Sequence, residues 1–166
     1  AESDGCETTL AKTFKVDKTA PATTAAPSRS ADSNGWYNHD VAVDFNGTDT
    51  TSGLESCSPD ATYSGPDTSG TTVAGTCRDI AGNTAPAMLP LKYDETAPQT
   101  SPAARAPDAN GWHNHAVTVT FQGTDGTSGV ATCTQTTYSG PDDPSVALTG
   151  TCVDQAGNQS PSALFT

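Results

Sequence analysis

The stretch NGWYNHDVAVDFNGTDTTSG, residues 34–53, decides the fold, because it returns with few changes as NGWHNHAVTVTFQGTDGTSG at residues 110–129. Three further blocks recur in the same order. They are VDKTAP (16–21) with YDETAP (93–98), TYSGPD (62–67) with TYSGPD (137–142), and GTCRDIAGN (75–83) with GTCVDQAGN (150–158). Self-similarity at one period is the signature of repeat architectures. The sequence therefore predicts two copies of one unit of about 75 residues.

The repeats divide the chain into three parts: a leader, residues 1–17, a first unit, residues 18–93, and a second unit, residues 94–166. The leader ends in Phe-Lys-Val-Asp (14–17), which corresponds to Leu-Lys-Tyr-Asp (91–94) at the end of the first unit. We therefore expect the leader to be the last strand of a preceding repeat. By the same comparison, the chain is expected to stop inside the last strand of another repeat.

One segment of each unit alternates apolar and polar residues. The apolar members are Val41, Val43 and Phe45 in the first unit, and Val117, Val119 and Phe121 in the second. A period of two places one set of side chains in a core and the other in water, which is typical of a half-buried β-strand. Residues 73, 75 and 77 share one face in the same way. Several short strands separated by turn signals predict a β-sandwich.

The expected turns have the residues that turns need. Shorter candidate strands at 22–26, 53–57, 62–65 and 85–93 are bounded by Pro, Gly or Asp. In TDTTSG and TDGTSG, the Asp side chain can cap its own turn and the Gly provides a positive φ. DIAGN at 79–83 and its second copy are typical of a short hairpin loop with Gly in the left-handed region.

Composition and charge exclude several classes of protein. Only 33% of the chain is apolar, too little to fill one large core, and 12 Pro and 15 Gly exclude long helices. A net charge of -12 repels the phosphate backbone, so nucleic-acid binding is excluded. No apolar run approaches the length that spans a membrane, so membrane insertion is not expected.

Two pairs of cysteines occupy corresponding positions. Cys57 and Cys77 lie 20 residues apart, and Cys133 and Cys152 lie 19 apart. A zinc site needs four ligands, whereas each unit offers only two cysteines and no nearby histidine. Disulfides Cys57–Cys77 and Cys133–Cys152 are favoured over buried free thiols, and they imply an oxidising compartment outside the cell or on its surface. Cys6 is left to pair with a preceding repeat or with another chain.

The run from DKTAP through GWYNHDVAVDF and DTTSG to GTCRDIAGN resembles the bacterial Ig-like tandem repeats of large secreted and cell-surface proteins. The resemblance covers both units. It implies an all-β fold of two tandem immunoglobulin-like β-sandwich modules, arranged as a stalk, adhesin shaft or accessory region. One feature departs from the family: many such repeats carry a Cys after the Phe of the core strand, where this chain has Gly47 and Gly123.

The resemblance also bears on Asp17 and Asp94, which stand at the starts of the two units. In giant-adhesin relatives, acidic residues at such junctions hold calcium. Calcium takes roughly six to eight oxygen ligands, so further carboxylates would be needed. The candidates are Asp49, Asp79, Asp125 and Asp154. The favoured interpretation is that these side chains cap turns and solvate the surface, with no cofactor.

Trp36 and Trp112 follow Asn-Gly and could be platforms for sugars, but we expect them to close one end of each sandwich. The adjacent histidines are His39, His113 and His115. Tyr37 replaces one of them in the first unit, which argues against a repeated metal site. We find no GxSxG, HExxH, Walker or Rossmann motif, and we predict no catalytic residue.

The sequence thus favours a non-enzymatic structural protein, extracellular or at the cell surface, acting as a rigid stalk, adhesin shaft or fibre segment. Its expected partners are neighbouring Ig-like repeats or identical subunits, and a glycan or host-surface ligand is compatible with this placement. Two alternatives remain. One is a self-assembling filament subunit that uses residues 1–17 for subunit contact, and the other is a glycan-binding accessory module of a secreted enzyme.

Overall fold

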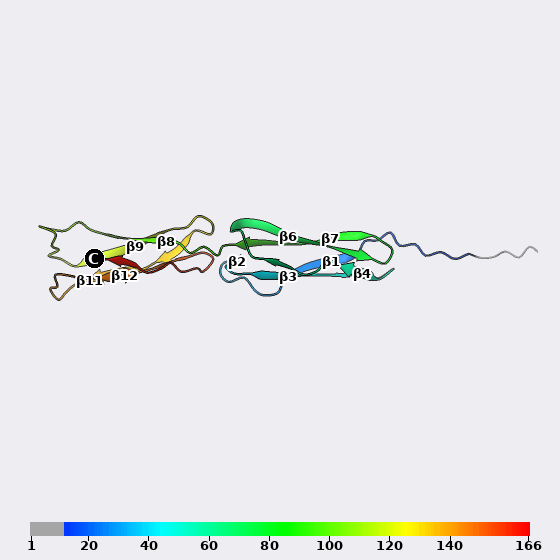
Figure 1. The fold of residues 1–166 in the computed structure, drawn as a ribbon, viewed down its shortest axis with the longest axis horizontal. Helices are drawn as coiled ribbons and strands as arrows, with labels where there is room; N and C mark the ends of the chain where they lie inside the picture. The colour runs from blue at the N-terminus through cyan, green and yellow to red at the C-terminus, as the bar shows by residue number, and fades with distance from the viewer. Residues whose placement is uncertain (1–11) are drawn as a thin grey trace, which may run out of the picture.

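The computed structural model describes residues 12–166. The predictions about Cys6 and about the first part of the leader lie outside the described residues. The described chain is all β and contains no helix. It forms a long, narrow molecule in which the strands of residues 18–93 (repeat 1) and those of residues 94–166 (repeat 2) follow one another along the long axis (Figure 1).

Repeat 1 contains seven strands: β1 (Ala22–Pro27), β2 (Trp36–Tyr37), β3 (Val41–Thr48), β4 (Leu54–Cys57), β5 (Ala61–Tyr63), β6 (Thr68–Asp79) and β7 (Thr84–Tyr93). Repeat 2 also contains seven: β8 (Gln99–Ala104), β9 (Val117–Thr124), β10 (Val130–Cys133), β11 (Gln135–Tyr138), β12 (Leu148–Gly150), β13 (Cys152–Asp154) and β14 (Ala163–Phe165).

Two sheets of repeat 1 pack against each other. One has the order β1-β3-β5 and the other the order β2-β7-β6-β4, and all their pairs are antiparallel except β2 with β7. Val43 and Phe45 of β3 form a core cluster with Ala87 of β7. The Thr23 hydroxyl of β1 donates a 2.6 Å hydrogen bond to the Pro86 carbonyl of β7. The two sheets therefore share one apolar interior.

Repeat 2 has a related arrangement with shorter ladders. Its strands form one sheet of order β8-β9-β11 and two pairs, β10-β13 and β12-β14. The core cluster joins Val117, Val119 and Phe121 of β9 to partly buried side chains that include Leu148 and Phe165. Among the described residues, no sheet combines strands from both repeats.

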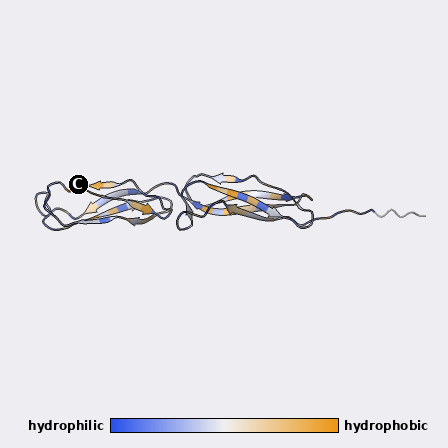
Figure 2. Ribbon diagram, turned by 90° about the horizontal axis from the view of Figure 1, so that it is seen from below, coloured by the Kyte–Doolittle hydropathy of each residue, from blue (hydrophilic) through white to orange (hydrophobic). Residues whose placement is uncertain are grey.

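The predicted core strand is confirmed. Val41, Val43 and Phe45 are buried, while the residues between them are more exposed. In Figure 2 apolar colour alternates with polar colour along the strands. The predicted turns are confirmed too, because the Asp49 carboxylate accepts hydrogen bonds from the N–H groups of Ser52 and Gly53, and Gly53 has a φ of 90°. The short strand β2 was not predicted, because two residues carry no periodic pattern.

The cysteines are bonded in the predicted pairs, Cys57–Cys77 and Cys133–Cys152. Each bond joins neighbouring antiparallel strands of one sheet, β4 with β6 and β10 with β13, and the bonded residues are direct register partners. The bonds thus reinforce a ladder instead of clamping two sheets together. Two disulfides indicate an oxidising environment. No helix among the described residues is long and apolar enough to cross a membrane.

Candidate functional site

Several hydrogen bonds hold the boundary between the two repeats. Strand β7 ends at Tyr93 and β8 begins at Gln99, so only residues 94–98 connect the repeats. The Asp94 N–H donates a 2.9 Å hydrogen bond to the Tyr37 carbonyl, and Asp94 is fully buried. Pro98 is fully buried as well and restricts its own φ. The connection is therefore fixed at both of its ends.

Side chains of repeat 1 bind the backbone of repeat 2. The Asn34 side-chain amide donates to both the main-chain and the side-chain carbonyl oxygens of Gln155, each at 3.0 Å. The Asn38 side-chain amide donates to the Ala156 carbonyl, also at 3.0 Å. These bonds reach the loop between β13 and β14, so the two repeats are joined through a segment distant in the sequence as well as through the covalent connection.

A third contact comes from Asp67, in the loop between β5 and β6. Its carboxylate accepts a hydrogen bond from the Glu95 N–H at 2.9 Å and another from the Thr96 hydroxyl. Hydrogen bonds to charged groups contribute about 1.5–3 kcal/mol when well made, more than neutral ones. The loop before β6 thus holds the first residues of repeat 2, and the segment around β2 holds Asp94 and the loop after β13.

The loop that presents Asn34 and Asn38 is tightly wound. Asn34 and Gly35 have φ values of 49° and 79°, a region that Asn and Gly tolerate best. The Asp32 carboxylate accepts the Asn38 N–H at 2.9 Å and pairs with Arg29 at 2.7 Å. This loop was predicted only as the surroundings of Trp36. The repeated NGWxN pattern was the available signal for its two asparagines.

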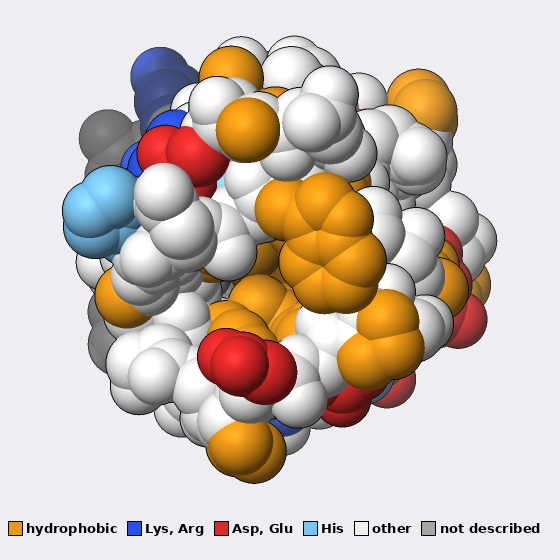
Figure 3. Space-filling view, turned by 90° about the vertical axis from the view of Figure 1, so that its left-hand side faces the viewer, with side chains coloured by type: hydrophobic (Ala, Val, Ile, Leu, Met, Phe, Trp, Pro, Cys, Tyr) orange, Lys and Arg blue, Asp and Glu red, His pale blue; other side chains and the backbone are white. Residues whose placement is uncertain are grey.

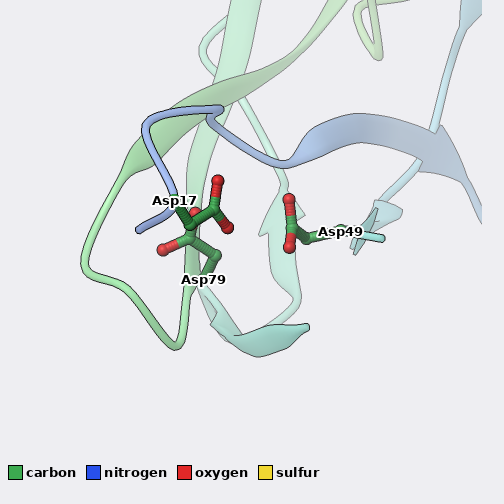
Figure 4. A group of neighbouring side chains, drawn as sticks. All are labelled: Asp17, Asp49 and Asp79. Atoms are coloured by element: carbon green, nitrogen blue, oxygen red, sulfur yellow. The ribbon is translucent and has the colours of Figure 1, made fainter. Parts of the chain in front are cut away.

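At the start of repeat 1, three aspartates from separate segments of the chain face one another. One carboxylate oxygen from each of Asp17, Asp49 and Asp79 lies within 4.8 Å of the others (Figure 4). The Asp17 carboxylate accepts the Ser52 N–H at 3.0 Å. Asp79 accepts both the main-chain and the side-chain N–H groups of Asn83 at 2.8 Å. We call this set the first acidic triad.

The second acidic triad, Asp94, Asp125 and Asp154, occupies the same position in repeat 2. Its hydrogen bonds match those of the first, because the Asp94 carboxylate accepts the Ser128 N–H at 2.9 Å and Asp154 accepts from Asn158. Burial raises the pKa of Asp94, although hydrogen bonds from Ser128 act against this change. A hydrogen bond from Ser52 instead holds the pKa of Asp17 below its usual value.

The chemistry of the triads suits two tasks. The carboxylates cap turns, as predicted, and tie the first residues of each repeat to its loops. Each triad could also place three carboxylate oxygens on one divalent cation, about half of what calcium takes. The sequence predicted all six residues, and the structure brings them together as two sets of three. Calcium stays the alternative that the sequence does not favour.

The tryptophans differ between the repeats. Trp36 is 8% exposed, beneath Lys92, whose Nζ lies 5.5 Å from the centre of the indole ring. Trp112 is 60% exposed. The expectation that both residues close a sandwich end therefore fits Trp36 and is wrong for Trp112. The histidines do not gather with acidic side chains or cysteines into a metal-binding group in the described part of the chain.

No protein-family model matches the chain, and no curated protein resembles it closely enough to count as a relative. The Ig-like interpretation of the repeats accordingly enters the argument below as a proposal.

Proposed function

We propose that the chain is a non-enzymatic extracellular spacer, in which two immunoglobulin-like sandwich modules, residues 18–93 and 94–166, form one stiff rod. In this function the protein sets a distance and a direction between whatever stands at its two ends. The task needs no reacting group, and it depends on the resistance of the module boundary to bending.

The observation that carries this proposal is the set of hydrogen bonds across the boundary. Neighbouring domains move relative to one another unless their interface restrains them. Here the Asp94 N–H bond to Tyr37 holds the covalent connection, while Asn34 and Asn38 hold the loop between β13 and β14. Because several hydrogen bonds join the two repeats in addition to the covalent connection, bending at the boundary would break some of them.

Two further features support an extracellular role for such a rod. Each module carries its own disulfide, which compensates for a small core by about 3 kcal/mol in the chain-entropy account. The surface is acidic, with a net charge of -12, which favours solubility and discourages contact with other acidic molecules. Both features suit a protein that works outside the cell without chaperones.

Small-angle X-ray scattering of the dilute protein tests the proposal. The asparagine pair at the boundary is removed in the double variant Asn34→Ala, Asn38→Ala. The matched control removes the corresponding pair of repeat 2, in Asn110→Ala, Asn114→Ala. We expect one elongated shape for the wild type and the control, and a broader distribution of shapes for the boundary variant. Two freely reorienting beads in the wild type would overturn the proposal.

A further inference from the structure

The repeated NGW motif contains a chemically reactive pair of residues. An asparagine followed by glycine undergoes spontaneous deamidation, because glycine has no Cβ atom to keep its main-chain nitrogen away from the preceding side chain. The chain contains three such pairs, at 34–35, 46–47 and 110–111. The first pair bears directly on the function proposed above, since the side chain of Asn34 crosses the boundary to Gln155.

Deamidation needs only water as a co-reactant. The main-chain nitrogen of the glycine attacks the Cγ atom of the asparagine, the bond from Cγ to Nδ2 breaks, and ammonia leaves with the proton of the glycine nitrogen. Water then opens the resulting succinimide ring at either of its two carbonyl carbons. The product is an aspartate or an isoaspartate, so the side chain loses both of its N–H donors and gains one negative charge.

The turn around Asn34 leaves the attacking nitrogen unrestrained. Residues 33–36 form a tight turn that is closed by the Trp36 N–H, which donates to the Ser33 carbonyl at 2.7 Å. Asn34 and Gly35 are both exposed, and beyond the neighbouring residues no atom lies within 4 Å of a Cβ position on Gly35. Within the described chain, the Gly35 N–H donates no hydrogen bond. Neither packing nor a hydrogen bond therefore holds this nitrogen.

The side-chain amide of Asn34, in contrast, is held in place. Its Nδ2 atom donates to the Ser33 hydroxyl at 3.1 Å and to the main-chain and side-chain oxygens of Gln155 at 3.0 Å each. An amide that is bound to Gln155 cannot turn back onto its own main chain. Cyclisation therefore requires the boundary to open, and its rate follows the fraction of molecules in which this contact is broken.

The pair at residues 46–47 is restrained by its strand. Both residues belong to β3 and lie in register with β1. A Cβ atom on Gly47 would stand 3.1 Å from the Leu54 side chain and 3.2 Å from the Cys77 sulfur, so the surroundings of this glycine are crowded. We therefore expect the Asn-Gly pair of β3 to stay intact for as long as repeat 1 is folded.

The second copy of the turn provides an internal reference. Asn110 and Gly111 have φ values of 47° and 84°, close to those of the first copy, and the Trp112 N–H closes the turn on the Ala109 carbonyl at 2.8 Å. This turn belongs to the end of repeat 2 that faces away from repeat 1, the end onto which Figure 3 looks. Among residues 12–166, the Asn110 side chain makes no hydrogen bond like those to Gln155. The two turns thus differ in their side-chain partners and share their main-chain geometry.

We propose that Asn34 is a site of slow, irreversible deamidation, whose rate is set by opening of the boundary and whose product keeps the boundary open. A carboxylate at position 34 faces the two oxygens of Gln155 with no hydrogen between them, so all three groups lose a partner. The new charge also joins the carboxyl groups of Asp32, two residues earlier, and of Asp154, next to Gln155. Like charges at short range oppose closure of the boundary.

The modification loosens the boundary without separating the repeats. The Asn38 amide still donates to the Ala156 carbonyl, and the Asp67 carboxylate still accepts the Glu95 N–H. The modified rod therefore bends more easily about residues 94–98, while each sandwich stays folded. This proposal rests on the spacer function and deepens it, because it gives the stiff form of the rod a limited lifetime that ends sooner the more often the boundary opens.

Peptide mapping by mass spectrometry, during long incubation of the full chain in mildly alkaline buffer, tests the site. Because two boundary hydrogen bonds protect Asn34, we expect it to react at least about tenfold more slowly than Asn110. Asp67→Ala removes another boundary contact and leaves the turn unchanged, so it should raise the rate at Asn34 and not that at Asn110. Asp60→Ala is the matched control, since this exposed carboxylate makes no hydrogen bond within the described chain, and it should change neither rate.

Asn34→Asp reproduces one of the two products and tests the consequence. Small-angle X-ray scattering of this dilute variant should show a broader distribution of shapes than the wild type, and the matched control Asn110→Asp should scatter like the wild type. Equal reaction rates at Asn34 and Asn110, or an Asn34→Asp variant as stiff as the wild type, would overturn the proposal. A failure of the spacer function is distinguishable, because the wild type would then be flexible before any incubation.

Discussion

Gly75 lies directly against the ring of Phe45: a Cβ atom on this glycine would stand 2.7 Å from the Cγ atom of the ring. Gly75 belongs to β6 and Phe45 to β3, so the glycine allows the two sheets of repeat 1 to approach each other. Gly150 and Phe121 have the same relationship in repeat 2. The repeated glycine of GTC is therefore a packing residue.

We predict that Gly75→Ala destabilises repeat 1 by about 1–3 kcal/mol, because the added methyl group must displace a buried aromatic ring. Gly70→Ala is the matched control, since no atom lies within 4 Å of a Cβ at that position of the same strand. Urea denaturation of the two variants measures the difference. Equal stabilities would show that the sheets are not packed as described.

Removal of one disulfide should affect one repeat. In Cys57→Ala, Cys77→Ala we expect the unfolding free energy of repeat 1 to fall by about 3 kcal/mol, because a 20-residue loop is no longer closed in the unfolded chain. Hydrogen exchange of amides in β6 and β9 reports on the repeats separately. Exchange that accelerates equally in β9 would argue against separate cores.

The pKa of Asp94 should lie above the ordinary aspartate value, and the pKa of Asp17 should lie below it. Burial raises the pKa of Asp94, so its contribution to stability is fully present below the pKa of the unfolded chain and is lost as pH rises through the higher folded value. Hydrogen bonds lower the pKa of Asp17, so its contribution is present above the unfolded pKa and is lost as pH falls through the folded value. Carboxyl ¹³C NMR should find Asp94 titrating at the higher pH, and the reverse order would contradict the burial at the boundary.

The acidic triads can be tested through Asp49, whose Oδ1 atom accepts the N–H groups of Thr51, Ser52 and Gly53. If turn capping is its task, Asp49→Ala should lower stability by about 1–3 kcal/mol, the cost of unsatisfied polar groups, whether a chelator or millimolar calcium is present. Thermal unfolding of wild type and variant in both conditions measures this. A wild type stabilised by calcium, beside a variant indifferent to it, would identify the triad as a cation site instead.

The fold class and the local turns could be predicted because their causes are local. The alternation of Val41, Val43 and Phe45 and the glycines after Asp49 and Asp79 act within a few residues. The disulfides were predictable because two cysteines per unit leave one pairing inside each. Asn34 and Asn38 could not be recognised as boundary residues, because hydrogen bonds to Gln155 and Ala156 depend on how two folded repeats meet.

The exposure of Trp112 could not be predicted for a related reason. Its sequence context is nearly that of Trp36, and both follow Asn-Gly. What covers Trp36 is Lys92, more than fifty positions away in the sequence, at the end of β7. Nearly identical local sequences thus differ in burial, because a residue distant in the sequence covers Trp36 and no described residue covers Trp112 in the same way.

The orientation of the two sandwiches relative to each other tests the central claim most directly. Residual dipolar couplings of backbone amides, measured for the dilute chain in a weakly aligning medium, give one alignment tensor for repeat 1 and another for repeat 2. A stiff rod predicts tensors of equal magnitude whose axes superimpose on the structure. Tensors of clearly different magnitude, as flexibly tethered beads would produce, would contradict it.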